Sequence, residues 1–249
     1  MMNIVVAMKQ VPDLQQIRIR NRKPVFDGVQ YTFGSLDKNA LEAGVQLKKA
    51  MGGKVIVLCV GSEDLEDTVK EALAAGGDEA VLIADDEYTN LDSQQTAILI
   101  AEGIKKIEDV GIVLFGEGSG DNYSSQVIGR VGELLEWPQV CYVNEISANG
   151  NSIIATRSLE ESIEKVEVEM PVVVSVVAEI NQIPIPPVSQ ILKAGRKPKE
   201  VLEAMDIEVE LPLEAISIIS RLAPENNRRG VIVNSVDELM NALKSENVI

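Results

Sequence analysis

The sequence contains no histidine among its 249 residues, and it has only two cysteines. Histidine is the most frequent general base, it completes Ser-His and Cys-His pairs, and it is the usual zinc ligand. Cys59 and Cys141 lie far apart in apolar runs, so we interpret them as core residues rather than as a disulfide or a redox pair. The composition therefore argues against hydrolytic chemistry by the chain alone and predicts no metal site.

Aromatic rings and positive charge are also scarce. Aromatic residues make up 3% of the chain, and the formal net charge is -16. This balance argues against binding to nucleic acid or to an anionic membrane surface. No apolar run approaches the ~20 residues needed to span a bilayer, and the opening M-M-N-I-V-V-A-M-K-Q shows no signal-peptide or transit pattern. We therefore expect a cytoplasmic protein without membrane insertion.

The chain does contain a regular alternation of strand-like and helix-like segments. Its length suits one large α/β domain, and 45% hydrophobic residues suffice for a full core. Nearly continuous apolar runs, typical of buried parallel strands, occur at 3–8, 54–60, 80–84 and 112–115. Helical spacing follows three of them, at about 36–51, 65–75 and 94–107. This order predicts a doubly wound, mainly parallel, Rossmann-like sheet.

The pattern of apolar and polar residues changes after residue 140. Segments 153–156 and 166–169 favour exposed antiparallel strands, and a buried strand follows Pro171. From residue 181 onward, prolines interrupt regular structure and four basic residues cluster, namely Lys193, Arg196, Lys197 and Lys199. We therefore divide the chain into a nucleotide-binding α/β domain, 1–180, and a C-terminal arm, 181–249. The arm is too small to form a hydrophobic core of its own, so we expect it to lie on a partner subunit.

The segment 110–138 is the most informative part of the chain. An apolar run ends in the glycine-rich loop G-E-G-S-G-D-N-Y-S-S-Q, which opens into helical spacing. If Ser124 or Ser125 caps that helix, the N–H groups of its first turn form a site for a phosphate. Asp121 could accept a hydrogen bond from a ribose hydroxyl. The glycines that would take positive φ and admit a ligand are Gly116, Gly118 and Gly120.

A plainer interpretation of the same loop is that its glycines only turn the chain and that Asp121 only caps a helix. The spacing by itself favours neither interpretation. In doubly wound sheets, ligands bind at the carboxyl ends of the strands, so the loops 8–13 and 61–64 should converge on this one. Lys9 could then stabilise a phosphate or a reduced flavin, although the residues by themselves favour an ordinary exposed lysine. For Asp37, a stabilising charge at a helix start is an adequate explanation.

Taken together, several motifs resemble the β subunit of electron transfer flavoproteins, in the branch called FixA-like. They cover essentially the whole chain: V-A-M-K-Q-V-P-D, L-D-K-N-A-L-E-A, G-E-G-S-G-D-N-Y-S-S-Q-V, W-P, I-P-P-V-S-Q-I-L-K-A-G-R-K-P and R-R-G-V-I-V-N-S-V-D-E-L. The resemblance implies an α/β domain of the adenine nucleotide alpha hydrolase-like type that pairs with an α subunit holding FAD. It also implies an adenine nucleotide in the sheet crevice of the β chain, bound by Ala7, Lys9, Val60, Asp121, Ser124, Ser125, Gln126 and Val127.

The resemblance carries two further expectations about side chains. Val188 and its neighbours, flanked by Lys193, would form the loop that docks on a partner dehydrogenase. Arg157 and Glu164, which bound a segment we interpret as a hairpin turn, would lie near the subunit interface and the flavins.

The function that the resemblance implies is electron transfer within a flavoprotein heterodimer. We favour the bifurcating version, in which FAD in this chain receives electrons from NADH and passes them to ferredoxin and, through the FAD of the α subunit, to a flavin-dependent dehydrogenase. One alternative is a plain carrier with AMP, which has no redox role, in the same pocket. An alternative from another class is a homodimeric, universal-stress-like nucleotide-binding module, but such modules end soon after their last strand.

Overall fold

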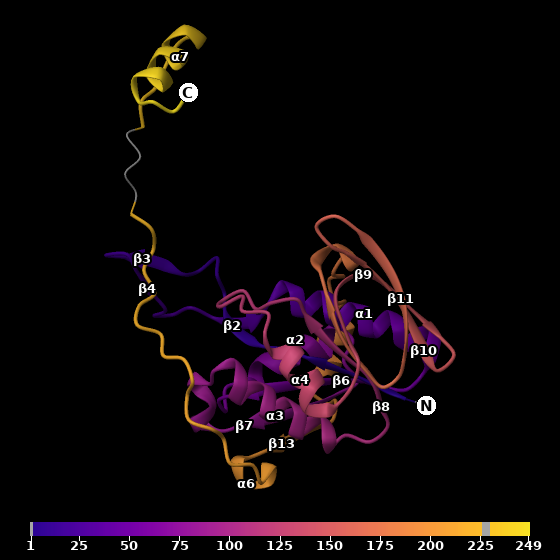
Figure 1. The fold of residues 1–249 in the computed structure, drawn as a ribbon. Helices are drawn as coiled ribbons and strands as arrows, with labels where there is room; N and C mark the ends of the chain where they lie inside the picture. The colour runs from indigo at the N-terminus through magenta and orange to yellow at the C-terminus, as the bar shows by residue number, and fades with distance from the viewer. Residues whose placement is uncertain (1, 226–229) are drawn as a thin grey trace. The chain divides into compact units, whose positions relative to one another are not determined.

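The computed structural model describes residues 2–225 and 230–249, and Figure 1 shows the path of the chain. Contacts divide the chain into two compact units. The first comprises Met1–Ile17 and Phe26–Ile218, and the second comprises Arg18–Val25 and Ile219–Ile249.

Nine strands of the described chain form one sheet in the first unit, in the order β11-β10-β9-β12-β8-β1-β6-β7-β13. The strands that pair in parallel are β1 (Asn3–Ala7), β6 (Val55–Gly61), β7 (Glu79–Ala84), β8 (Val110–Gly116), β9 (Gln139–Asn149), β12 (Val172–Val176) and β13 (Lys199–Leu202). One edge continues in antiparallel pairing through β10 (Ser152–Ser158) and β11 (Ile163–Glu169). The predicted doubly wound, mainly parallel sheet is confirmed.

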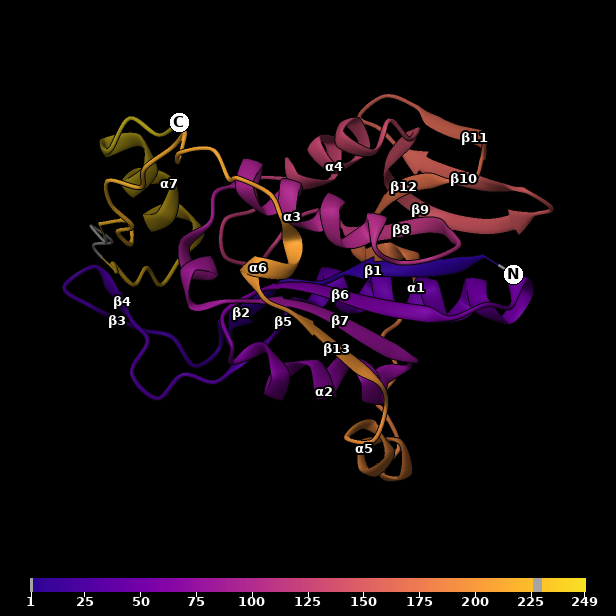
Figure 2. The same cartoon turned by 90° about the horizontal axis from the view of Figure 1, so that it is seen from below.

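Helices cover both faces of this sheet (Figure 2). The apolar cluster on one face includes side chains of α1 (Ser35–Met51), α2 (Leu65–Ala75) and α5 (Val188–Ala194). The cluster on the other face includes side chains of α3 (Ser93–Lys105), α4 (Val127–Leu135) and α6 (Ala204–Ile207). Alternate residues of β1 point to opposite faces, with Ile4 in the first cluster and Val5 in the second. Burial on both faces explains why the strand sequences are continuously apolar.

Short elements complete the first unit. Strands β2 (Gln10–Pro12) and β5 (Tyr31–Phe33) pair in a separate small sheet, and two 3-10 turns, η1 (Asp86–Asn90) and η2 (Ala178–Ile180), follow β7 and β12. The helix α3 begins with a capping box, in which Asp92 accepts from the backbone N–H of Gln95 and the Gln95 amide oxygen accepts from the N–H of Asp92.

The first unit continues beyond residue 180, where the sequence suggested that an arm begins. Strand β13 pairs in parallel with β7, and α5 packs against α2, so part of the segment 181–218 lies on the sheet domain itself. The division between the units instead falls after Ile218. Contact of residues 181–249 with a partner subunit stays a prediction.

The second unit is small and has little core. Strands β3 (Arg18–Arg20) and β4 (Lys23–Val25) form a hairpin. The carbonyl of Arg22 in this hairpin accepts a hydrogen bond of 2.7 Å from the N–H of Ala223, which belongs to the C-terminal part of the unit. The helix α7 (Val236–Ser245) is capped by Ser235, as the S-V-D-E pattern indicates, and none of its residues is buried. The two arginines of the R-R-G motif, 228 and 229, lie outside the described residues.

None of the helices in the described part of the chain combines the length and the apolar character that crossing a bilayer requires.

Candidate functional site

The candidate site lies where the order of the strands reverses. Strand β1 pairs with β8 on one side and with β6 on the other. The helix that follows β1 covers one face of the sheet, whereas the helix that follows β8 covers the other. The chain therefore leaves the adjacent ends of β1 and β8 toward opposite faces of the sheet. Proteins of this fold class usually bind their ligand in a crevice at such a position, so we take it as the candidate site.

An ion pair joins these two loops. The Lys9 ammonium lies 2.7 Å from a carboxylate oxygen of Asp121, and the two side chains are 46% and 23% exposed. Burial disfavours the charged carboxylate, but hydrogen bonds from Lys9, Ser119 and the Asn122 backbone, together with the Lys9 charge, hold the pKa of Asp121 below its usual range. The structure thus brings together two residues that the sequence analysis assigned to one site.

A buried carboxyl group lies directly beneath this pair. The Asp37 side chain accepts hydrogen bonds from the backbone N–H groups of Lys9, at 2.8 Å, and of Gly116. Burial raises the pKa of Asp37 to about 7, although both hydrogen bonds and the Lys9 charge oppose the rise and the negative charge of Asp121 adds to it. Asp37 therefore connects the start of α1 to the ends of β1 and β8.

The burial of Asp37 differs from the prediction. We interpreted this residue as a charge near a helix start, whereas the residue is only 7% exposed. The signal was present in the spacing, because Asp37 precedes Ala40, Leu41 and Gly44 by three, four and seven residues and so shares their buried face. A carboxylate on the apolar face of a helix is rarely tolerated without a specific set of partners.

The glycine-rich loop takes an unexpected backbone conformation. We predicted positive φ at Gly116, Gly118 and Gly120, but the residues of this loop with positive φ are Tyr123, at 46°, and Ser125, at 53°. Gly116 is required for another reason, because a Cβ there would lie 2.8 Å from the Leu36 backbone. Left-handed conformations of non-glycine residues are uncommon and cluster at functional sites.

The start of α4 also differs from the prediction. Neither Ser124 nor Ser125 caps the helix, because α4 begins at Val127, with Gln126 at the N-cap and no side-chain cap. The Gln126 amide oxygen instead accepts a hydrogen bond from the Ser93 hydroxyl at 3.0 Å. Since no side chain caps the first turn, its N–H groups remain available to an anionic ligand.

The remaining residues of the predicted nucleotide site lie at strand ends. Ala7 is the buried last residue of β1, and Val60 is a partly buried residue near the end of β6. The loop after β1 also meets the region after β6, because the Gln10 amide donates to the Thr68 hydroxyl of α2 at 2.6 Å. The expected convergence of these loops is therefore confirmed, whereas ligand binding by them stays a prediction.

Arg157 and Glu164 form an ion pair at a distance from this crevice. They face each other across the β10–β11 hairpin, and a guanidinium nitrogen lies 2.6 Å from a Glu164 oxygen. Two strands, β12 and β9, separate β10 from β8. The predicted hairpin is present, but within this chain the pair belongs to the antiparallel edge of the sheet and not to the Lys9–Asp121 site.

Val188 and Lys193 lie on α5, where apolar side chains project into solvent. Val188 is 72% exposed and Leu192 is 75% exposed, and Lys193 is also exposed. Ala194 is the buried residue of this helix. The predicted docking residues thus share one exposed helix, and their partner stays a prediction.

The fold and the site together define an α/β protein of the doubly wound class, with a candidate anion or nucleotide site at its strand-order reversal. Residues 25–207 match the family model described as "Electron transfer flavoprotein domain". The chain is 34% identical over 261 aligned residues to the electron transfer flavoprotein subunit beta of Thermoanaerobacterium thermosaccharolyticum, and the alignment covers all of both chains.

Two other relatives have similar levels of identity. The subunit beta of Clostridium acetobutylicum is 36% identical, over 84% of this chain and 81% of the relative. The subunit CarD of the caffeyl-CoA reductase-Etf complex of Acetobacterium woodii is 32% identical, over 83% of this chain and 80% of the relative. The chain belongs to the electron transfer flavoprotein family. The resemblance inferred from its motifs is confirmed, and the universal-stress-like alternative is set aside.

The buried Asp37 carboxyl makes stability depend on pH. The pKa of Asp37 in the folded state, about 7, lies above the ordinary value of 3.8. The raised pKa therefore contributes to the free energy of unfolding fully below about pH 4, and this contribution is lost as the pH rises through about 7. Asp37→Asn should remove this dependence. Relative to the variant, the wild type should lose up to about 4 kcal/mol of unfolding free energy between pH 4 and pH 8.

Urea unfolding of wild type and variant at several pH values measures this difference. Asp86→Asn, which changes an exposed carboxylate of η1, is the matched control and should leave the profile of the wild type unchanged. A pH profile of Asp37→Asn that runs parallel to that of the wild type would contradict the assignment.

Proposed function

We propose that this chain is the β subunit of an electron transfer flavoprotein heterodimer and that its crevice at the ends of β1 and β8 binds an adenine nucleotide. The observation that carries the proposal is the Lys9–Asp121 ion pair, which joins the two loops at the strand-order reversal. The family assignment supplies the electron-transfer role. The partner would be an electron transfer flavoprotein α subunit.

The donors at the crevice suit a phosphate ester. The first turn of α4 offers backbone N–H groups and the positive end of the helix dipole, with no side-chain cap in competition. Ser124, Ser125, Gln126 and Val127 form the entry to this turn. Lys9, from the loop after β1, supplies a cation, and Asp121, from the loop that leads into α4, supplies an acceptor for hydroxyl groups. These are the groups that a ribose and its phosphates require.

Among the adenine nucleotides, we favour FAD, in a heterodimer that bifurcates electrons. The flavin would supply two-electron chemistry with NADH and one-electron transfer to ferredoxin and, through the FAD of the α subunit, to a flavin-dependent dehydrogenase. Support comes from the Acetobacterium woodii relative, whose name places it in a reductase-Etf complex. The chain itself would bind, orient and shield the FAD.

Three side chains would set the electrostatics of the crevice. Lys9 places positive charge beside the ligand, Asp121 partly neutralises it, and Asp37 holds a carboxyl group that is close to half-protonated near pH 7. Because Asp37 accepts from the N–H of Lys9, it also fixes the backbone from which the Lys9 side chain extends. Of these three groups, the Lys9 ammonium is the one that would favour negative charge on a bound group.

The nucleotide content of the purified heterodimer tests this proposal first. With the α subunit co-expressed, we expect two FAD molecules and no AMP per heterodimer, measured by flavin absorbance and by chromatography of the released nucleotides. One FAD and one AMP would instead identify a plain carrier. No nucleotide beyond that of the α subunit would contradict the proposed crevice.

Blocking the entry to α4 tests the position of the site. Ser125→Trp should lower the nucleotide content of this subunit at least about tenfold, because the indole would occupy the space in front of the first turn. Ser125→Gly suits the φ of 53° and adds no bulk, so it should retain the nucleotide. Glu133→Trp, near the far end of the same helix, controls for the added ring. Full nucleotide content in Ser125→Trp would place the site elsewhere.

The exposed face of α5 would dock on the dehydrogenase. Val188→Asp should raise the dehydrogenase concentration that half-saturates electron transfer by about tenfold, because a carboxylate would enter an apolar contact. Nucleotide content and heterodimer formation should not change. Steady-state electron transfer to a purified flavin-dependent dehydrogenase measures the effect, with Leu134→Asp on α4 as the control. Unchanged half-saturation would exclude α5 as the docking element.

A further inference from the structure

The segment that carries the docking helix is fastened to the domain at two points. The first is Asn181, which forms reciprocal hydrogen bonds with Asn39 of α1. The Asn39 amide donates to the Asn181 side-chain oxygen at 3.0 Å and to its carbonyl at 3.1 Å, and the Asn181 amide donates to the Asn39 carbonyl at 2.9 Å. Asn39 is 4% exposed, so these hydrogen bonds are shielded from water.

The second point is Lys197, three residues after the end of α5. Its ammonium donates to the carbonyls of Leu73, at 2.7 Å, and Gly77, at 2.5 Å. These carbonyls lie at the C-terminal end of α2, where a helix has acceptors without intrahelical partners and the negative end of its dipole. Lys197 therefore ties the chain after α5 to the helix against which α5 packs.

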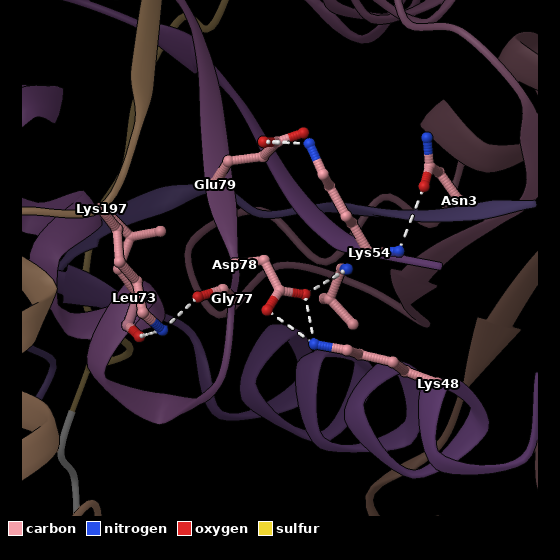
Figure 3. A network of polar contacts seen from close by, with 9 residues as sticks. Asn3, Lys48, Lys54, Leu73, Gly77, Asp78, Glu79 and Lys197 are labelled. Carbon is pink, nitrogen blue, oxygen red and sulfur yellow. Dashed lines mark hydrogen bonds and ion pairs between the residues drawn. The ribbon is translucent and has the colours of Figure 1, made fainter. Parts of the chain in front are cut away.

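The contacts of Lys197 differ from those of the neighbouring lysines. Figure 3 shows its ammonium between the two carbonyls, whereas Lys48 pairs with Asp78 and Lys54 pairs with Glu79. Asp78 also accepts from the backbone N–H of Val55. Burial is the main cause that lowers the pKa of Lys197, and the Lys48 charge adds to this effect while Asp78 opposes it. The ammonium is thus held by oriented carbonyls rather than by a carboxylate of its own.

Between these two points, most residues of the segment are exposed. Ile185 is 93% exposed, and a groove of about 200 Å³ lies between Ile183–Pro186 and the side chains of α1 and α2. In α5, Ala194 is buried, whereas Val188, Ile191 and Leu192 are exposed. Packing on α2 therefore buries one side chain of α5, so the two fixed ends can contribute to the orientation of this helix.

We propose that Lys197 is a positioning residue for partner docking, because its bonds to the end of α2 fix the C-terminal end of α5 and present the exposed side chains of α5 in one orientation. This inference rests on the proposed docking role of α5. An interface element that is ordered before contact loses less conformational entropy on binding, so the loss of the tether should weaken docking without changing the nucleotide site.

Lys197→Met in the complete heterodimer tests this role, because it keeps the length of the aliphatic stem and removes the ammonium. Lys199→Met is the matched control, since Lys199 pairs with Glu66 on the surface. Amide hydrogen exchange of peptides covering 188–196 should become about tenfold faster in Lys197→Met and stay unchanged in Lys199→Met. The dehydrogenase concentration for half-saturation should rise by a similar factor, with maximal rate and nucleotide content unchanged.

Each outcome of this experiment decides the proposal. Unchanged exchange of α5 in Lys197→Met would overturn it, because packing on α2 would then suffice. Faster exchange with unchanged half-saturation would also overturn it, and Val188→Asp identifies the reason. If that variant impairs docking, only the positioning role has failed, and if it does not, the docking role of α5 has failed. Should Lys197→Met not assemble, the same measurements on Lys197→Gln, whose amide is one bond too short, decide the proposal.

Discussion

The parallel pairing of β1 with β6 on one side and β8 on the other is the constraint on which the rest of the structure depends. Parallel strands require a crossover. Here the sheet extends from β1 through β6 and β7 in one direction and then resumes with β8 on the other side of β1, which places helices on both faces of the sheet. The same geometry sends the chain from β1 and from β8 toward opposite faces. The candidate site at this point is therefore a consequence of the topology, and we expect the residues of those two loops to decide what it binds.

At the candidate site, a carboxyl group in an unfavourable environment connects the ends of two strands. Asp37 connects the backbone of Lys9 and of Gly116 although burial raises its pKa to about 7. Above it, the Lys9–Asp121 pair is more exposed and keeps the Asp121 carboxylate charged. Two carboxyl groups near one lysine thus have pKa values displaced in opposite directions, because one is buried and the other accepts several hydrogen bonds. Carboxyl groups whose pKa values are displaced in this way are typical of functional sites.

The opposite end of the strands has a different role. There, Lys48, Lys54 and Lys197 hold the end of α2 and the starts of β6 and β7 through carboxylates and carbonyls. The segment from Asn181 to Lys197 is attached at its ends, so the apolar residues of α5 remain in solvent without becoming part of the core. Under the proposed function, the same sheet therefore provides a ligand site at one end and supports a partner-docking helix at its flank.

Local sequence determined the elements of this fold, because strand and helix signals are carried by neighbouring residues. Continuous β-branched runs marked β1, β6, β7 and β8, and the 3.6-residue spacing marked α1, α2 and α3. The motifs also placed the chain in its family. Tertiary structure decided the burial of Asp37, the positive φ at Ser125 in place of the glycines, and the incorporation of β13 into the sheet. It also decided the partners of Lys9 and Lys197, which lie 112 and 124 residues away in sequence. Those contacts depend on which loops the sheet topology brings together. A local sequence pattern does not determine contacts between residues so far apart in the sequence.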